Sequence, residues 1–186
     1  MPEVFDFTTF PTLTSDRLVL RAPEPDDAAD LLVWRSDPVV QRYNSAPMQE
    51  VAEAAALIAD LRREYADRRA IHWLVTLRGE DRPVGLFGFG GWERWHRRAD
   101  VGYDLRRDHW GRGIATEALG LLLRFGFDRM DLNRVEAQTI ADNHESVRLL
   151  ERLGFRRDGL RRSYSLEDDG TFHDGAIYGL LRHEYR

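Results

Sequence analysis

The chain has 186 residues, 42% of them hydrophobic and 32% charged, which fits a folded domain with a sizeable core and excludes an intrinsically disordered chain. It contains no cysteine, so disulfides, thiolate nucleophiles and cysteine metal sites are excluded. All 27 basic residues are arginines, which excludes Schiff-base lysines and the lysine of a Walker-type phosphate loop, and the net charge of −5 argues against nonspecific binding to nucleic acid.

The N-terminal half of the chain alternates between strand-like and helix-like hydropathy. Residues 17–21 alternate as a short strand, and Pro25 with the acids after it is typical of a first helical turn. Further along, Ala55, Ile58 and Leu61 recur at helical spacing. The expected elements are a strand at 17–21, helices at about 25–35 and 49–69, and strands at 71–78 and 83–92.

The C-terminal half continues the mixed pattern, with Asn143 as a candidate helix cap and Asp169-Gly170 as a predicted turn. This order predicts an α+β fold in which about four helices flank one twisted mixed sheet of six to seven strands. We expect a single domain over residues 1–186, with 1–12 as a loosely ordered lead-in. The expected elements are a strand at 98–105, a helix at about 113–128, a strand at 134–140, a helix at about 145–153, and strands at about 155–164 and 171–181.

The loop Gly111–Ala115 joins a predicted strand to a predicted helix and has the residues of an anion site. Gly113 allows a ligand to approach the backbone closely, and Ala115 keeps the first helical turn thin. The exposed amides and the charge of about +0.5 at a helix start suit a pyrophosphate. Arg107 and Arg112 add candidate charge-assisted contacts.

Two other interpretations of this loop stay open. A glycine-containing turn from strand to helix has the same residues and binds nothing. A Rossmann dinucleotide turn is nearly matched by the run from Gly111 to Thr116. Against it, threonine stands at the sixth position, and five residues separate the strand from the first glycine, where a Rossmann turn is tight.

Two motifs resemble the GNAT superfamily of N-acetyltransferases. Trp110-Gly-Arg-Gly-Ile-Ala-Thr-Glu-Ala118 resembles its acetyl-CoA pyrophosphate loop, and a tryptophan before Gly-x-Gly is usual in the branch with the ribosomal-protein N-terminal acetyltransferases. Asn143-His-Glu-Ser146, followed by Gly154-Phe155, resembles the Asn-x-x-Ser helix of the family and its Gly-Phe ending. The resemblance covers nearly the whole chain from about Leu13, including segments at Arg17–Arg21, Val40–Tyr43 and Val84-Gly85.

The resemblance implies a sheet splayed between the strand at Ala99–Leu105 and the strand at Arg134–Ile140, with acetyl-CoA in the gap. Pantetheine would pair with the backbone of Tyr103 and Leu105 as an added strand, and Asn143 would bond the pantetheine arm. The implied cofactor contacts are therefore Tyr103, Leu105, Arg107, Gly111, Arg112, Gly113, Ile114, Ala115, Asn143 and Ser146.

Direct attack of an amine on a thioester needs a base for the amine, and we favour Asp100 for that role. Strand alternation places it on the polar face of its strand, and its position matches the Glu in the Glu-x-Gly-Tyr pattern of the same branch. Glu93 and His96, on the preceding turn, are rivals. The alternative without chemistry is a solvated carboxylate paired with Arg98.

The leaving thiolate needs an acid, and the resemblance assigns that role to Ser146. Many GNAT enzymes have a tyrosine four residues further on, where this chain has Leu150. The alternative is a serine of the first helical turn that bonds the backbone. Tyr43, Trp92 and Trp95 are candidates for the wall of the acceptor pocket, with ordinary packing as their alternative role.

The favoured function is acetylation of an N-terminal α-amine, as in the ribosomal-protein-alanine type. An α-amine has a pKa near 8 and a lysine amine near 10.4, so roughly 250-fold more of the α-amine is reactive at neutral pH. The alternatives are a small-amine acetyltransferase and a non-catalytic acyl-CoA-binding module.

The other expected properties follow from absences. The histidines show no metal-ligand spacing, so we expect no metal. The apolar runs are too short for a membrane span, and the first residues do not resemble a secretory signal. We therefore expect a cytoplasmic enzyme whose partners are acetyl-CoA and an amine, without membrane or nucleic acid, and with a homodimer as a candidate assembly.

Overall fold

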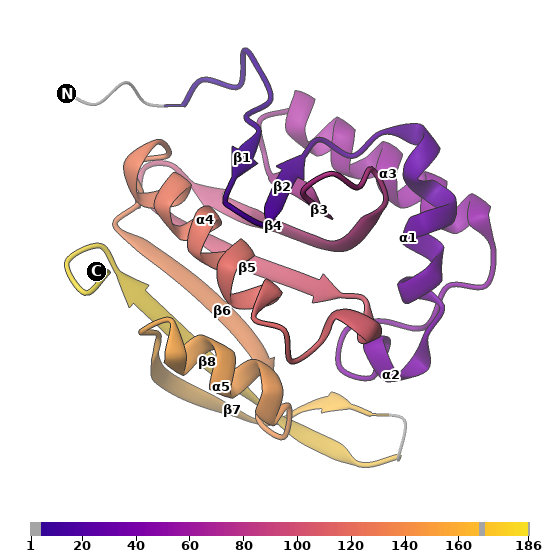
Figure 1. The fold of residues 1–186 in the computed structure, drawn as a ribbon. Helices are drawn as coiled ribbons and strands as arrows, with labels where there is room; N and C mark the ends of the chain where they lie inside the picture. The colour runs from indigo at the N-terminus through magenta and orange to yellow at the C-terminus, as the bar shows by residue number, and fades with distance from the viewer. Residues whose placement is uncertain (1–4, 168–169, 186) are drawn as a thin grey trace.

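The computed structural model describes residues 5–167 and 170–185, which form one open sheet with helices on both faces (Figure 1). The sheet has eight strands in the order β1-β2-β3-β4-β5-β6-β8-β7. Its strands are β1 (Leu13–Thr14), β2 (Leu18–Arg21), β3 (Ile71–Leu77), β4 (Pro83–Glu93), β5 (Arg98–Leu105), β6 (Arg134–Ile140), β7 (Arg156–Leu166) and β8 (Phe172–Leu181). The α-helices are α1 (Ala28–Arg35), α2 (Pro38–Gln41), α3 (Val51–Ala66), α4 (Ile114–Asp128) and α5 (His144–Arg152), and 3₁₀ turns lie at Pro25–Asp27 and Arg107–His109.

The predicted α+β fold with a mixed sheet is confirmed, with two short elements in addition. The two-residue strand β1 pairs with β2 and adds an eighth strand. Helix α2 follows Asp37, whose side chain accepts a hydrogen bond from the amide of Val39 at 2.8 Å. Elements of two and four residues are too short for a hydropathy period to show. The predicted turn at Asp169-Gly170 includes Asp169, which lies outside the described residues.

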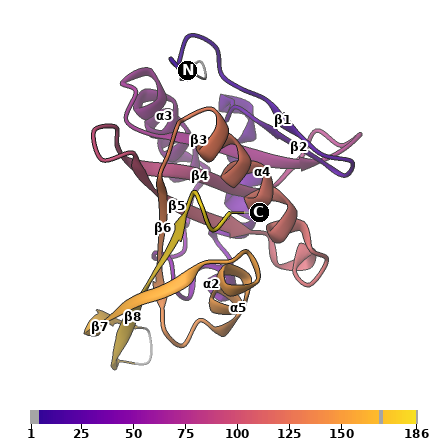
Figure 2. The same ribbon diagram turned by 90° about the vertical axis from the view of Figure 1, so that its left-hand side faces the viewer.

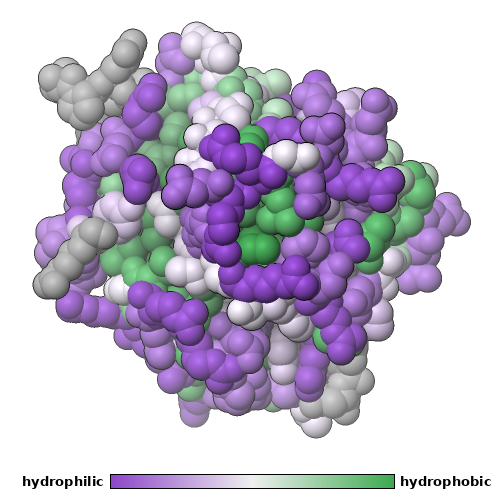
Figure 3. Space-filling view, in the orientation of Figure 1, coloured by the Kyte–Doolittle hydropathy of each residue, from purple (hydrophilic) through white to green (hydrophobic). Residues whose placement is uncertain are grey.

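Alternation along the strands produces an apolar core on each face of the sheet. On β4, Phe87 and Phe89 belong to the larger core, which includes Leu119 and Leu122 of α4. Leu86, the residue before Phe87, points to the other face and belongs to the smaller core under α1 and α3. The turned view in Figure 2 shows α4 and α3 on different sides of the sheet. On the face viewed in Figure 3, polar residues cover most of the surface, and apolar residues appear mainly in the hollows between them.

The N-terminal segment packs on the larger core from the first residue that the structure describes. Phe5 and Phe7 are buried, with ring centroids 4.7 Å apart, and the amide of Phe5 donates to the carbonyl of Arg129 at 2.8 Å. The indole of Trp73 donates to the carbonyl of Pro11 at 2.7 Å. Residues 5–12, which we expected to belong to a lead-in, form no helix or strand, but Phe5 and Phe7 are buried in the core.

The sheet opens between β5 and β6, as the resemblance implied. These strands pair in parallel only at Arg98↔Arg134, Ala99↔Val135 and Asp100↔Glu136, although both strands continue beyond these pairs. On either side the sheet stays paired, β5 with β4 and β6 with β8. Figure 1 shows the two strands diverging toward the end of β5.

The backbone of β5 presents unused hydrogen-bonding groups to this opening. The carbonyl of Arg97 accepts from the amides of Asn133 (2.6 Å) and Arg134 (3.2 Å), so odd-numbered residues of β5 direct their backbone groups toward β6. Beyond the last pair, backbone groups of Val101 and Tyr103 therefore face the gap. The indole of Trp110 donates to the carbonyl of Leu105 at 2.7 Å and closes the end of this edge.

Candidate active site

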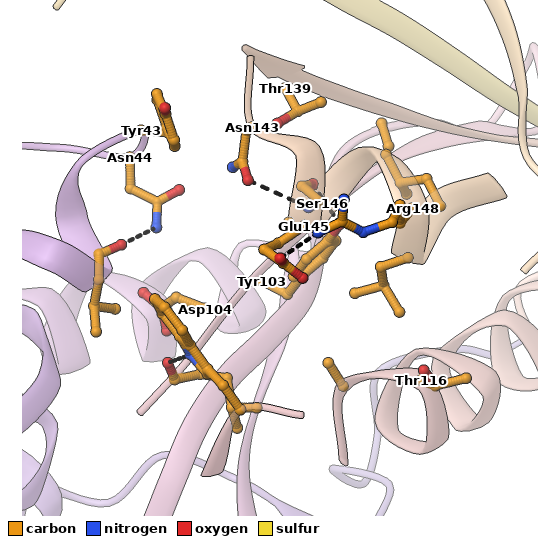
Figure 4. Close-up of a pocket in the computed structure, with 18 of the residues that line it drawn as sticks. Tyr43, Asn44, Tyr103, Asp104, Thr116, Thr139, Asn143, Glu145, Ser146 and Arg148 are labelled. Atoms are coloured by element: carbon orange, nitrogen blue, oxygen red, sulfur yellow. Dashed lines mark hydrogen bonds and ion pairs between the residues drawn. The ribbon is translucent and has the colours of Figure 1, made fainter. Parts of the chain in front are cut away.

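A cavity of about 850 Å³ occupies the opening between β5 and β6 and has walls from both faces of the sheet. One wall comes from the start of α4 and from α5, and the opposite wall comes from α2 and the residues after it. In Figure 4, Tyr43 and Asn44 lie across the opening from Asn143 and Ser146. The cavity therefore connects the two faces through the sheet.

The loop before α4 directs free amides into the cavity. Gly111 and Gly113 have φ angles of +72° and +75°, a left-handed conformation that glycine adopts without strain. The first helical hydrogen bond runs from the amide of Glu117 to the carbonyl of Gly113 at 3.1 Å. Among the described residues, the amides of residues 111–116 donate to no protein acceptor. Free amides at a helix start, together with the helix dipole, are the groups that an anion site requires.

Residues from the turn between β1 and β2 brace this loop. Arg17 donates from Nε to Glu117 at 2.7 Å and from Nη1 to the carbonyl of Arg112 at 3.1 Å, and Ser15 donates to Glu117 at 2.6 Å. Burial alone would raise the pKa of Glu117, but the bonds from Ser15 and Arg17 outweigh it and lower that pKa. The loop is therefore fixed in position by contacts about a hundred residues away in sequence.

The two arginines predicted to assist this loop lie outside the cavity lining. Arg107 borders a separate surface hollow with Val33, Trp34 and Asp37. The side chain of Arg112 is exposed, and its carbonyl, which accepts from Arg17, is the part that contributes to the loop. Of the predicted loop residues, Gly111 and Gly113 therefore line the cavity, and the side chains of the two arginines do not.

The start of α5 places Asn143 and Ser146 in the cavity wall. Asn143 is the helix cap, and its Oδ1 accepts from the amide of Ser146 at 3.2 Å. Its amide nitrogen remains free to donate, since no described residue accepts from it. The hydroxyl of Ser146 lies 2.8 Å from the hydroxyl of Tyr103, so its partner is a side chain on β5 and not the helix backbone.

Tyr103 is a functional candidate whose side chain the sequence did not reveal. We predicted only a backbone role for it, but its side chain points to the face that α5 covers. Burial raises its pKa to about 12, while the hydrogen bond to Ser146 lowers it by a smaller amount. The phenol therefore stays protonated at neutral pH and can pass a proton to Ser146. Its alternation with Gly102 and Asp104 predicts which face it occupies, but not its partner.

Asp100 lies at the closed end of the opening and not in the cavity lining. It occupies the last β5–β6 pair, opposite Glu136, and its side chain is exposed. Partial burial and the Glu136 carboxylate raise its pKa, and Arg98 opposes them. The rivals Glu93, at the end of β4, and His96, on the turn after it, are exposed and do not line the cavity either.

Of the three predicted acceptor-wall residues, Tyr43 lines the cavity and both tryptophans lie elsewhere. The register of β4 against β5 shifts between Gly90 and Glu93, which turns the end of β4 away. Trp92 packs on Phe7 with ring centroids 5.4 Å apart, and Trp95 is 90% exposed. The break in register accounts for the displacement of Trp92, and Trp95 lies on the turn that follows β4.

A buried ionic group stands between the acceptor-side wall and β5. The carboxylate of Asp104 accepts from the indole of Trp34 at 2.8 Å and lies 2.8 Å from Nε of Arg35. Burial raises the pKa of Asp104, opposed by Arg35 and the bond from Trp34. Because Asp104 also lines the cavity, this group fixes α1 to the strand that carries the site.

Two further properties concern the described part of the chain as a whole. Its histidines, aspartates and glutamates form no group of three or more that suits a metal ion. None of its helices combines the length and apolar character that a membrane span requires.

Comparisons with known proteins agree with this geometry. The family model of the acetyltransferase (GNAT) domain matches residues 17–156. The uncharacterized N-acetyltransferase p20 of Bacillus licheniformis is 36% identical over 175 residues, which cover 94% of this chain and 98% of that protein. The [ribosomal protein uS5]-alanine N-acetyltransferase of Escherichia coli is 25% identical over 177 residues, which cover 90% of this chain and 89% of that protein. The structure of Mycobacterium smegmatis RimJ in complex with CoA-disulfide matches with a TM-score of 0.83 and 25% identity, covering 94% of this chain and 89% of that one.

Proposed function

Because this chain belongs to the GNAT acetyltransferase family and is an N-acetyltransferase, we propose that its acceptor is the N-terminal α-amine of a protein or peptide. The observation that carries the proposal is the cavity with walls on both faces of the sheet. One side offers helix-start amides to a diphosphate, and the other offers Tyr43 and Asn44 to an acceptor. Similarity to the ribosomal-protein-alanine enzyme of Escherichia coli supports the same class of acceptor.

The donor fits the residues on the α4 and α5 side. We assign the diphosphate of acetyl-CoA to the amides of residues 111–116, and its pantetheine arm to the unused backbone groups of Val101 and Tyr103 and to Asn143. When bound, acetyl-CoA supplies an activated thioester carbonyl. The hydroxyl of Ser146, backed by Tyr103, is the group that we assign to protonate the departing sulfur.

The position of Asp100 favours an α-amine over a lysine side chain. Since its carboxylate does not line the cavity, we infer that it receives the proton through water. A base that takes the proton through an intervening water suffices for an amine with a pKa near 8. An amine with a pKa near 10.4 is almost entirely protonated at neutral pH. The exposed face of β5 next to Asp100 also leaves room for the rest of a peptide.

The acceptor assignment is tested by a panel of amines scored for thiol release from acetyl-CoA. The panel contains peptides that begin with Ala or Ser, the same peptides with a blocked N-terminus and one internal lysine, a polyamine and an aminoglycoside. We expect turnover with the free N-terminal peptides and little with the blocked ones. Turnover restricted to the polyamine or the aminoglycoside would support the small-amine alternative. Acetyl-CoA binding without turnover on any amine would support a binding module.

The donor assignment predicts that Gly113→Val weakens acetyl-CoA binding at least about tenfold, which corresponds to about 1.4 kcal/mol. A Cβ at this position would lie 3.5 Å from Nη2 of Arg17, which braces the loop, and the φ of +75° adds strain of roughly 1–2 kcal/mol for any residue with a Cβ. Calorimetric titration measures the affinity. Gly120→Ala is the matched control in the same helix, because a Cβ there meets no atom within 4 Å. Unchanged affinity in a folded Gly113→Val variant would contradict the loop assignment.

A further inference from the structure

We propose that Glu136 is a positioning residue of the transfer reaction that acts through Asp100. Its carboxylate, fixed by Arg134, faces Asp100 across the last β5–β6 pair and sets the charge that the acceptor amine meets there. The inference rests on the proposed role of Asp100 as the base and adds a second residue to it.

The register places the two carboxylates together. Asp100 pairs with Glu136 in the parallel ladder, and paired residues direct their side chains to the same face. Ala99 and Val101 belong to the core under α4, so Asp100 and Glu136 lie on the opposite face, which also carries α2. The strands separate immediately beyond this pair. The two carboxylates therefore lie where the opening begins, on its acceptor side.

Glu136 is fixed in place, whereas Asp100 is free. Arg134 donates from Nε to Glu136 at 2.6 Å and also forms an ion pair with Asp158. Among the described residues, none forms a hydrogen bond or an ion pair with the carboxylate of Asp100. One carboxylate of the pair is thus anchored, and the other remains available to a ligand.

The charges around Asp100 come from two elements. Its own strand contributes Arg98, which lowers its pKa, and β6 contributes Glu136, which raises it. The facing positions of β4 are Gly90 and Gly91, which have no side chains, and Gly91 lies so close that a Cβ there would meet the carboxylate at 2.6 Å. Glu136 is therefore the only carboxylate that raises the pKa of Asp100 among the described residues.

Two adjacent carboxylates favour a cation and strengthen the base. The acceptor amine arrives largely as an ammonium ion and is attracted to the pair. One proton of the ammonium then moves to Asp100 through water, and the neutral nitrogen bonds to the thioester carbonyl carbon. As the carbon–sulfur bond breaks, the sulfur leaves and takes a proton from Ser146, and the nitrogen loses its second proton to water, which leaves an amide and a free thiol. Because partial burial and Glu136 both raise the pKa of Asp100, the carboxylate accepts this proton more readily than an isolated aspartate.

The test is Glu136→Gln, with Asp158→Asn as the matched control. Both substitutions remove one carboxylate partner of Arg134, but Asp158 is not among the charges that shift the pKa of Asp100. Without Glu136 the pKa of Asp100 falls. We therefore expect the acidic limb of the pH profile of kcat/KM to move to lower pH. We also expect kcat at neutral pH to fall roughly threefold to tenfold and KM for the amine to rise. Asp158→Asn should leave the limb in place.

The outcomes separate this inference from the role of Asp100 itself. An unmoved acidic limb in Glu136→Gln, or an equal movement in both variants, would overturn the role of Glu136. If Asp100→Asn retains full activity, the assignment of the base fails as well. Melting temperatures of both variants show whether a loss of activity follows from a loss of folded protein.

Discussion

Replacement of Asp100 by asparagine is expected to lower kcat by roughly 10²-fold or more while leaving acetyl-CoA affinity unchanged. The amide keeps the shape of the side chain but cannot accept the proton of the amine. The expected loss shrinks as the pH rises toward the pKa of the acceptor amine, because more acceptor then arrives neutral. Steady-state rates across a pH series, with a peptide acceptor at saturation, measure both effects.

The sign of the pH dependence follows from the raised pKa of Asp100. The carboxylate acts as a base only when ionised, so wild-type activity falls as the pH drops through that pKa. The asparagine variant should lack this fall in activity at acidic pH. Glu93→Gln and His96→Gln are suitable controls, since both residues are exposed, Glu93 at the end of β4 and His96 on the turn before β5. A large loss in one of them, with full activity in Asp100→Asn, would transfer the role of the base to that residue.

Replacement of Ser146 by alanine is expected to lower kcat by roughly 10- to 10²-fold. A thiol with a pKa near 8.5 gives a fair leaving group without help, so protonation assists the step without being essential. Asn143 caps the helix through the backbone amide of residue 146, which the substitution preserves. Acetyl-CoA affinity should therefore change little. The rate loss should be smaller with a thioester whose thiol is more acidic.

The hydrogen bond between Ser146 and Tyr103 allows the source of the proton to be identified. If the phenol passes its proton through Ser146, Tyr103→Phe should lower kcat about as much as Ser146→Ala, and the double variant should lose little more. If Tyr103 only orients the serine, Tyr103→Phe should lower kcat less than Ser146→Ala does. A joint fall in melting temperature and acetyl-CoA affinity in Ser146→Ala would show a structural role instead.

Local sequence signals predicted the central strands and the two loops of the site. The expected strands at 98–105 and 134–140 have the observed bounds, because alternation and flanking turns determine them locally. The left-handed glycines and the Asn143 cap have their physical cause within a few residues of chain, and both motifs line the same cavity. Patterns with a local cause are readable from one sequence.

Features that depend on how distant elements dock could not be predicted. The bond from Tyr103 to Ser146 joins residues 43 apart, and the contact of Arg17 with Glu117 joins residues 100 apart. Such pairs depend on which elements pack together and in what register. Hydropathy indicates only which face of an element is buried. Trp92 was misplaced for a related reason, because one shift in register redirects every side chain after it.

The cavity has walls on both faces of the sheet, and this arrangement bears on the order of binding. In the proposed assignment the donor lies on the side of α4 and α5 and the acceptor on the side of α2, so neither has to displace the other. Both reactants would then occupy the protein at once, and the acetyl group would pass directly between them without a covalent acyl-enzyme intermediate. Coenzyme A and the acetylated product would leave from opposite faces of the sheet, so the release of one would not have to wait for the other.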